Sequence, residues 1–100
     1  MRIFVSLRAR SDLLDIYGYL AERSPAAAER IMARLSQRFD ELREFPLSGR
    51  DRSEFGPSLR SLLIDGYGAF YLVEADRVVI VRALDGRGDI EREMSNPSSS

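Results

Sequence analysis

The sequence contains no cysteine and no histidine, and each absence removes a class of function. Without cysteine there is no disulfide framework and no thiolate catalysis. Without histidine there is no Ser-His-Asp triad, and without both residues there is no zinc finger or other site with histidine or thiolate ligands. Only oxygen ligands remain, and these suit Mg²⁺ or Ca²⁺.

Lysine is also absent, because all 15 basic residues are arginine. This excludes a Schiff-base lysine and the lysine of a phosphate-binding P-loop. The chain also has 16 acidic residues, so its net charge is −1. Residues 1–50 hold 9 arginines and 7 acidic residues, and residues 51–100 hold 6 arginines and 9 acidic residues. Because there is no basic excess, we do not expect strong non-specific binding to DNA or RNA.

Long apolar runs are missing too, since the longest spans only a few residues. Neither a membrane span nor the apolar core of a signal peptide is present, so we expect a cytoplasmic protein without membrane association. A chain of 100 residues has the length of one domain. We expect a single domain over residues 1–94 and a disordered tail over residues 95–100.

The first half of the chain reads as a strand followed by two helices. Ile3–Val5 is rich in β-formers, and Ser6 offers an N-cap hydroxyl to a helix that runs to about Glu22. Ser24-Pro25 is a second start signal, and this helix ends before Phe45-Pro46. The helical spacing of apolar residues supports both helices, with Ala9, Leu13, Ile16, Tyr17 and Leu20 in the first and Ala28, Ile31, Met32, Leu35, Phe39 and Leu42 in the second.

The second half predicts a meander of strands. After a loop over Leu47–Pro57, three β-rich runs follow, and Asp65-Gly66 between the first two is typical of a type I′ hairpin turn. The runs are Leu59–Ile64, Tyr67–Val73 and Val78–Leu84, and Asp89–Met94 then predicts one helical turn. The fold class is therefore α+β in the order β-α-α-β-β-β, with a helical hairpin packed on one face of a small, mainly antiparallel sheet and the other face partly open.

An ordered set of residues over about residues 3–94 resembles the ParE branch of the RelE/ParE toxins. The set is Asp12-Leu13, Ile16-Tyr17, Tyr19-Leu20, Pro25, Ala28, Leu42, Pro46, Gly49-Arg50, Leu59-Arg60-Ser61, Tyr67, Phe70-Tyr71, Val78–Arg82 and Leu84–Arg87. The resemblance implies the toxin of a type II toxin–antitoxin system, which inhibits DNA gyrase by binding and stabilising its cleaved-DNA complex. It also implies a cognate ParD-like antitoxin that neutralises the toxin, in a hetero-oligomer, with a segment that folds on binding.

RelE members of the superfamily instead cut mRNA on the ribosome, with several basic residues and a tyrosine near the C-terminal end. In this chain the last tyrosine is Tyr71, and arginine cannot act as a general base near neutral pH. We therefore expect action by binding rather than catalysis. The expected target-binding residues are Arg60, Arg82 and Arg87, on an exposed surface that includes residues 82–94.

Two alternatives remain open at this point. As an mRNA interferase, the chain would bind the phosphates of RNA through Arg50, Arg60, Arg82 and Arg87. The alternative interpretation is that these are ordinary exposed arginines at the ends of strands, without a role in function. As a non-toxic module, the chain would only bind its antitoxin. Asp85 bears on the second alternative, because many ParE-like sequences have histidine at this position.

A second set of residues suits the antitoxin. Arg30, Arg34 and Arg38 recur every four residues along the second helix, as either a solvated face or a docking row for an acidic partner. Leu14 and Tyr19 lie outside the main apolar face of the first helix, where they either pack on the second helix or anchor a segment of the antitoxin. We expect an amphipathic helix and an added strand of the antitoxin to lie over the hairpin and a sheet edge.

We expect no metal site and no cofactor. The acidic residues near the C-terminus do not have the spacing of an EF-hand loop, and a solvated acidic end explains them better. They are Asp85, Asp89, Glu91 and Glu93. Gly66-Tyr67-Gly68 lies in a hairpin, and it is not a dinucleotide-binding loop.

Overall fold

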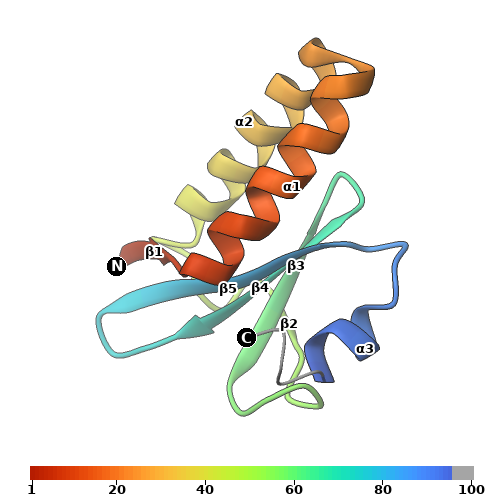
Figure 1. The fold of residues 1–100 in the computed structure, drawn as a ribbon. Helices are drawn as coiled ribbons and strands as arrows, with labels where there is room; N and C mark the ends of the chain where they lie inside the picture. The colour runs from red at the N-terminus through yellow and green to blue at the C-terminus, as the bar shows by residue number, and fades with distance from the viewer. Residues whose placement is uncertain (96–100) are drawn as a thin grey trace.

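The computed structural model describes residues 1–95, in which a strand and two helices are followed by four strands and a short helix (Figure 1). The elements are β1 (Arg2–Val5), α1 (Leu7–Arg23), α2 (Pro25–Glu41), β2 (Arg50–Asp51), β3 (Leu59–Ile64), β4 (Tyr67–Val73), β5 (Arg77–Asp85) and α3 (Ile90–Ser95). Of the predicted disordered tail over residues 95–100, Ser95 instead ends α3, and residues 96–100 lie outside the described residues. Within residues 1–95, no helix combines the length and the apolar character needed to cross a membrane.

The five strands form one sheet in the order β1-β5-β4-β3-β2. β1 runs parallel to β5, with Ile3 opposite Val78, and the other neighbours are antiparallel. The predicted α+β class and element order are confirmed. β2 corrects the prediction of a continuous loop over residues 47–57, because Arg50 and Asp51 pair with the edge of β3. Two charged residues carry no alternating pattern that reveals a strand.

Both predicted helix starts are confirmed. The Ser6 hydroxyl accepts a hydrogen bond from the backbone N–H of Ala9 at 3.0 Å. The Ser24 hydroxyl accepts one from Ala27 at 3.2 Å, and Pro25 occupies the first turn, where its missing N–H is harmless. Because Ser24 ends α1 and caps α2, the two helices form the expected hairpin, whose connecting end extends beyond the sheet (Figure 1).

The turn between β3 and β4 is also as predicted. Asp65 and Gly66 have φ angles of 49° and 89°, and both central residues of a type I′ turn need a positive φ. This turn carries Asp65 toward α2, where its carboxylate lies 3.3 Å from the guanidinium of Arg34. The hairpin tip is therefore tied to the helical layer.

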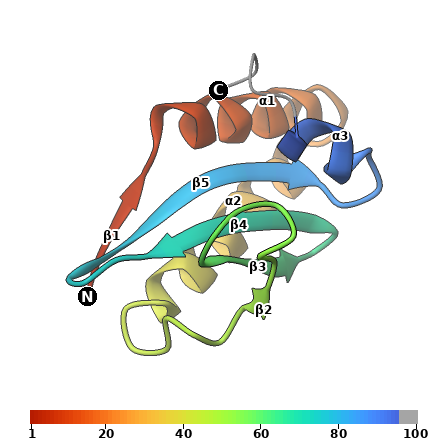
Figure 2. The same cartoon turned by 90° about the horizontal axis from the view of Figure 1, so that it is seen from below.

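The main core lies between the helical hairpin and one face of the sheet, as Figure 2 shows from below. α1 packs over β5, and α2 lies over β3. The largest fully buried side chains are Tyr71, Phe70, Leu35, Leu42, Ile64, Ile80 and Val78. Part of the opposite face is covered by the chain itself, because Phe55 in the segment between β2 and β3 packs edge-on against Phe70 with ring centroids 6.0 Å apart.

Candidate functional site at the C-terminal edge of the sheet

Arg82 on β5 is held in a buried bidentate pair with Asp12 on α1. Its Nε lies 2.8 Å from Asp12 Oδ2, and its Nη2 lies 3.3 Å from Asp12 Oδ1. Arg82 is 9% exposed and Asp12 is 8% exposed. The fork of a guanidinium matches the two oxygens of a carboxylate, so this geometry fixes both side chains. Our expectation that Arg82 lies on an exposed surface is therefore wrong.

Asp12 also compensates for a strand that ends early. β1 stops at Val5 opposite Ile80, so within residues 1–95 the rest of β5 has no neighbouring strand on that side. The Oδ2 atom of Asp12 accepts a hydrogen bond from the backbone N–H of Ala83 at 2.9 Å. The Ser6 hydroxyl donates to the carbonyl of Val81 at 3.2 Å. Two side chains thus satisfy backbone groups that would otherwise be left without partners.

Arg82 extends this arrangement to α3. Its Nη2 lies 3.5 Å from Glu93 Oε2, and its Nη1 donates to the backbone carbonyl of Glu93 at 3.5 Å. The hydrogen bond to Asp12, aided by the charges of Asp12 and Glu93, raises the pKa of Arg82 above its ordinary value despite partial burial. One permanently charged side chain therefore connects α1, β5 and α3.

Arg87 is a cation of this region that faces solvent. Its side chain is 80% exposed, and its Nη2 lies 3.2 Å from Asp85 Oδ2. The backbone N–H of Arg87 also donates to Asp85 Oδ1 at 2.9 Å. Hydrogen bonds from the Arg87 side chain and backbone lower the pKa of Asp85 below its usual range. Asp85 thus orders the segment that presents Arg87.

Arg60 holds a loop through two backbone carbonyls. Its Nη1 donates to the carbonyl of Gly49 at 2.7 Å and to that of Leu47 at 3.3 Å. On the neighbouring strand, the Tyr71 hydroxyl accepts from the N–H of Gly49 and donates to the carbonyl of Pro46, both at 2.8 Å. The two side chains together fix the segment that leads into β2.

The four arginines considered for phosphate contact are not assembled around one site. Arg50, Arg82 and Arg87 line three different cavities, and Arg60 is engaged with backbone carbonyls. Three of the four acidic residues of this end are also engaged. Asp85 binds Arg87, Glu93 binds Arg82, and Asp89 accepts from the N–H of Arg92. Over residues 1–95, no three acidic side chains converge closely enough to hold a metal ion.

The residues expected to bind the antitoxin lie on the outside of the helical hairpin. Leu14 is 72% exposed and Tyr19 is 52% exposed, with the Arg23 guanidinium stacked 3.7 Å from the Tyr19 ring centre. Arg34 pairs with Asp65, and Arg38 pairs with Glu41 at 3.4 Å. Arg30 lines a cavity shared with Tyr67 and Arg87. These ion pairs explain how the helix tolerates a row of like charges.

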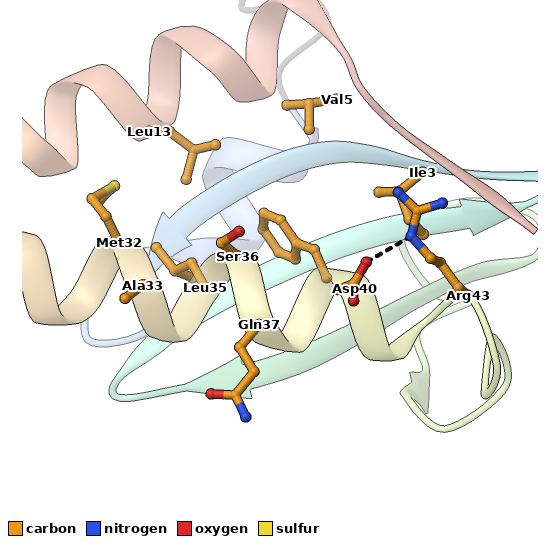
Figure 3. A pocket seen from close by; sticks show the side chains of 11 residues that line it. Ile3, Val5, Leu13, Met32, Ala33, Leu35, Ser36, Gln37, Asp40 and Arg43 are labelled. Carbon is orange, nitrogen blue, oxygen red and sulfur yellow. Dashed lines mark hydrogen bonds and ion pairs between the residues drawn. The ribbon is translucent and has the colours of Figure 1, made fainter.

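A larger groove of about 710 Å³ opens between α1, α2 and β1 (Figure 3). Apolar side chains from all three elements line it, and the ion pair between Asp40 and Arg43 stands at one end. The lining includes Ile3, Val5, Leu13, Met32, Leu35 and Phe39. Sequence reasoning missed this groove because its lining belongs to the same apolar stripes as the core.

Comparison with known proteins decides the family. Residues 3–90 match the family model described as the ParE toxin of the type II toxin–antitoxin system parDE. The chain belongs to the ParE toxin family. It is 36% identical to Toxin ParE3 of Caulobacter vibrioides over 61 residues, and the match spans 61% of each chain. The chain thus spans about three fifths of that relative.

The ParE fold is also found by comparison of structures. The chain resembles a chain of the chromosomal ParDE toxin–antitoxin system from P. aeruginosa with a TM-score of 0.71 and 22% identity. The likeness covers 85% of this chain and 95% of the other. Within this ParE fold, the role of Asp12 was missed from the sequence. The available signal was an acidic residue between Ala9 and Ile16, at helical spacing on the buried face of α1.

Proposed function

We propose that the chain inhibits DNA gyrase by binding and stabilises the cleaved-DNA complex of the enzyme. The observation that carries this proposal is the distribution of the arginines. Arg82 and Arg60 are engaged in internal contacts, and Arg50 and Arg87 line separate cavities, so these four arginines do not form one cluster suited to phosphoryl chemistry. What remains at the C-terminal edge is a surface: the exposed Arg87, the ordered turn at Asp85, and α3. Such a surface suits recognition of a protein–DNA complex in the cytoplasm, where charged groups at the rim favour association.

The test uses purified gyrase and a supercoiled plasmid. We expect the chain to inhibit supercoiling and to increase the cleaved DNA recovered after denaturation of the enzyme. Arg87→Glu should weaken both effects, since it reverses the charge of an 80% exposed side chain. Arg10→Glu is the matched control, because Arg10 is exposed on α1, away from this edge.

Failure of the wild-type chain to affect gyrase would reject the proposal. Cleaved mRNA in cells that make the chain would then favour the interferase instead. If neither effect is found but a ParD-like antitoxin binds tightly, the chain is a non-toxic binding module. If gyrase is inhibited but Arg87→Glu acts like the wild type, the target contacts another surface.

We further propose that the chain forms a hetero-oligomer with a ParD-like antitoxin, whose amphipathic helix occupies the groove between α1, α2 and β1. Two observations support this placement. The groove is apolar and lined by both helices, and Ile3 and Val5 of its wall belong to β1, the edge strand of the sheet. A strand of the antitoxin can therefore extend the sheet beside the helix that fills the groove. Leu14, Tyr19, Arg30, Arg34 and Arg38 would flank this site on the helical hairpin.

A further inference from the structure

The short helix α3 depends on the rest of the molecule for its position. A helix of 6 residues is far below the length at which an isolated helix is stable in water. Its own turn is supported by the N–H of Arg92, which donates to Asp89 Oδ1 at 3.0 Å, and by the N–H of Glu93, which donates to the Asp89 carbonyl at 3.1 Å. These bonds shape the helix but do not attach it to the sheet.

The polar attachment runs through Arg82. A guanidinium has five N–H groups on three nitrogens. In Arg82, Nε and Nη2 contact the Asp12 carboxylate. Nη1 contacts the backbone carbonyl of Glu93, and Nη2 also contacts the Glu93 carboxylate. The Asp12 side of this arrangement is buried and bidentate, whereas the Glu93 side chain is 50% exposed. The strong, buried half therefore fixes the guanidinium, and the weaker, exposed half holds α3.

We propose that Arg82 is a positioning residue, which Asp12 fixes in place and which holds α3 through Glu93 in the orientation that the target recognises. Arg82 itself does not contact the target. The structural half of this proposal stands on the contacts of Arg82, and the functional half rests on the proposed inhibition of gyrase.

The test compares two glutamates of the same helix. Glu93→Gln removes the ion pair with Arg82 and leaves the pair between Arg82 and Asp12 intact. Glu91→Gln is the matched control, since Glu91 is exposed and forms no ion pair within the described part of the chain. Glu93→Arg and Glu91→Arg form a stronger second pair, because an arginine at position 93 is repelled by Arg82.

Hydrogen exchange of the amides of residues 90–94 reports the opening of α3 in the chain alone. We expect exchange on the order of 2- to 5-fold faster in Glu93→Gln, and faster still in Glu93→Arg, as befits the loss of one partly exposed ion pair. Both Glu91 variants should exchange like the wild type, and β3 to β5 should keep their protection in all four. Exchange at the wild-type rate in both Glu93 variants would overturn the proposal.

Gyrase inhibition by the same variants tests the functional half. The concentration for half-inhibition should rise by a similar factor in Glu93→Gln. The control for inhibition is Glu22→Gln, an exposed change on α1 outside the target-binding surface, which should match the wild type. Faster exchange without any change in inhibition would overturn the link between the position of α3 and target binding. If the wild type does not inhibit gyrase, the proposed function fails, and hydrogen exchange alone then decides whether Glu93 holds α3.

Discussion

Asp12 and Arg82 are 70 positions apart in the sequence, and their side chains form two hydrogen bonds in the buried space between α1 and β5. The same carboxylate accepts the N–H of Ala83, so it neutralises a buried charge and completes the edge of a strand at once. Burying an ion pair costs the hydration of both charges, and removing one partner is strongly destabilising because the other charge is left buried without full compensation. We therefore expect this pair to matter for the stability of the C-terminal edge.

The first prediction concerns the stability that this pair maintains. Asp12→Ala should lower the free energy of unfolding by about 3–5 kcal/mol, because the Arg82 guanidinium loses its buried bidentate partner and the Ala83 N–H loses its acceptor. Asp12→Asn should cost less, since its amide oxygen still accepts from Ala83. Chemical denaturation measures both values. Arg82→Ala is destabilising for the same reason, so loss of toxicity in that variant does not identify a target contact.

A double-mutant cycle provides the control for this prediction. The variant with both Asp12→Ala and Arg82→Ala should cost clearly less than the sum of the two single changes, because neither charge is then left buried alone. Additive costs would show that the two side chains contribute independently.

The second prediction concerns the segment that enters β2. Tyr71→Phe removes a hydroxyl that accepts from Gly49 and donates to Pro46, and it should lower the free energy of unfolding by about 1–3 kcal/mol. Tyr17→Phe is the matched control, because the Tyr17 hydroxyl donates to Glu29 on the surface. Equal stability of the two variants would contradict a structural role for the Tyr71 hydroxyl.

Much of this fold is predictable from local signals. The caps at Ser6 and Ser24 and the turn at Asp65-Gly66 depend on neighbouring residues, so their chemistry is visible in the sequence. The contacts of Arg82 cannot be predicted in this way. An arginine in a strand gives the same local sequence pattern whether its side chain faces solvent or pairs with an aspartate 70 positions away. Pairing across such a distance depends on how α1 lies over β5, which the periodicity of neither element specifies. The same limit hid β2 and the groove beside β1.

The third prediction concerns alkaline pH. Burial raises the pKa of Tyr67 and of Tyr71 above the ordinary value for a phenol. Above pH 10 or so, the unfolded chain therefore loses these protons before the folded chain does, and the free energy of unfolding falls as the pH rises. Denaturation at stepwise higher pH should show this decline, and Tyr71→Phe should make it shallower. A decline of equal slope in the variant would exclude Tyr71 as a source.

The fourth prediction tests the groove between α1, α2 and β1. Ala33 lines this groove on α2 and is exposed, so Ala33→Arg places a large charged side chain in the path of an apolar helix with little effect on the core. Ala26→Arg is the matched control, because Ala26 is exposed on the same helix outside the groove. With a cognate ParD-like antitoxin, we expect Ala33→Arg to weaken binding at least tenfold by calorimetry and Ala26→Arg to leave it unchanged. If both variants bind like the wild type while Leu14→Ser or Tyr19→Ser weakens binding, the antitoxin occupies the outer face of the hairpin instead. That outcome would also explain why the large apolar side chain of Leu14 is 72% exposed to solvent in the free chain.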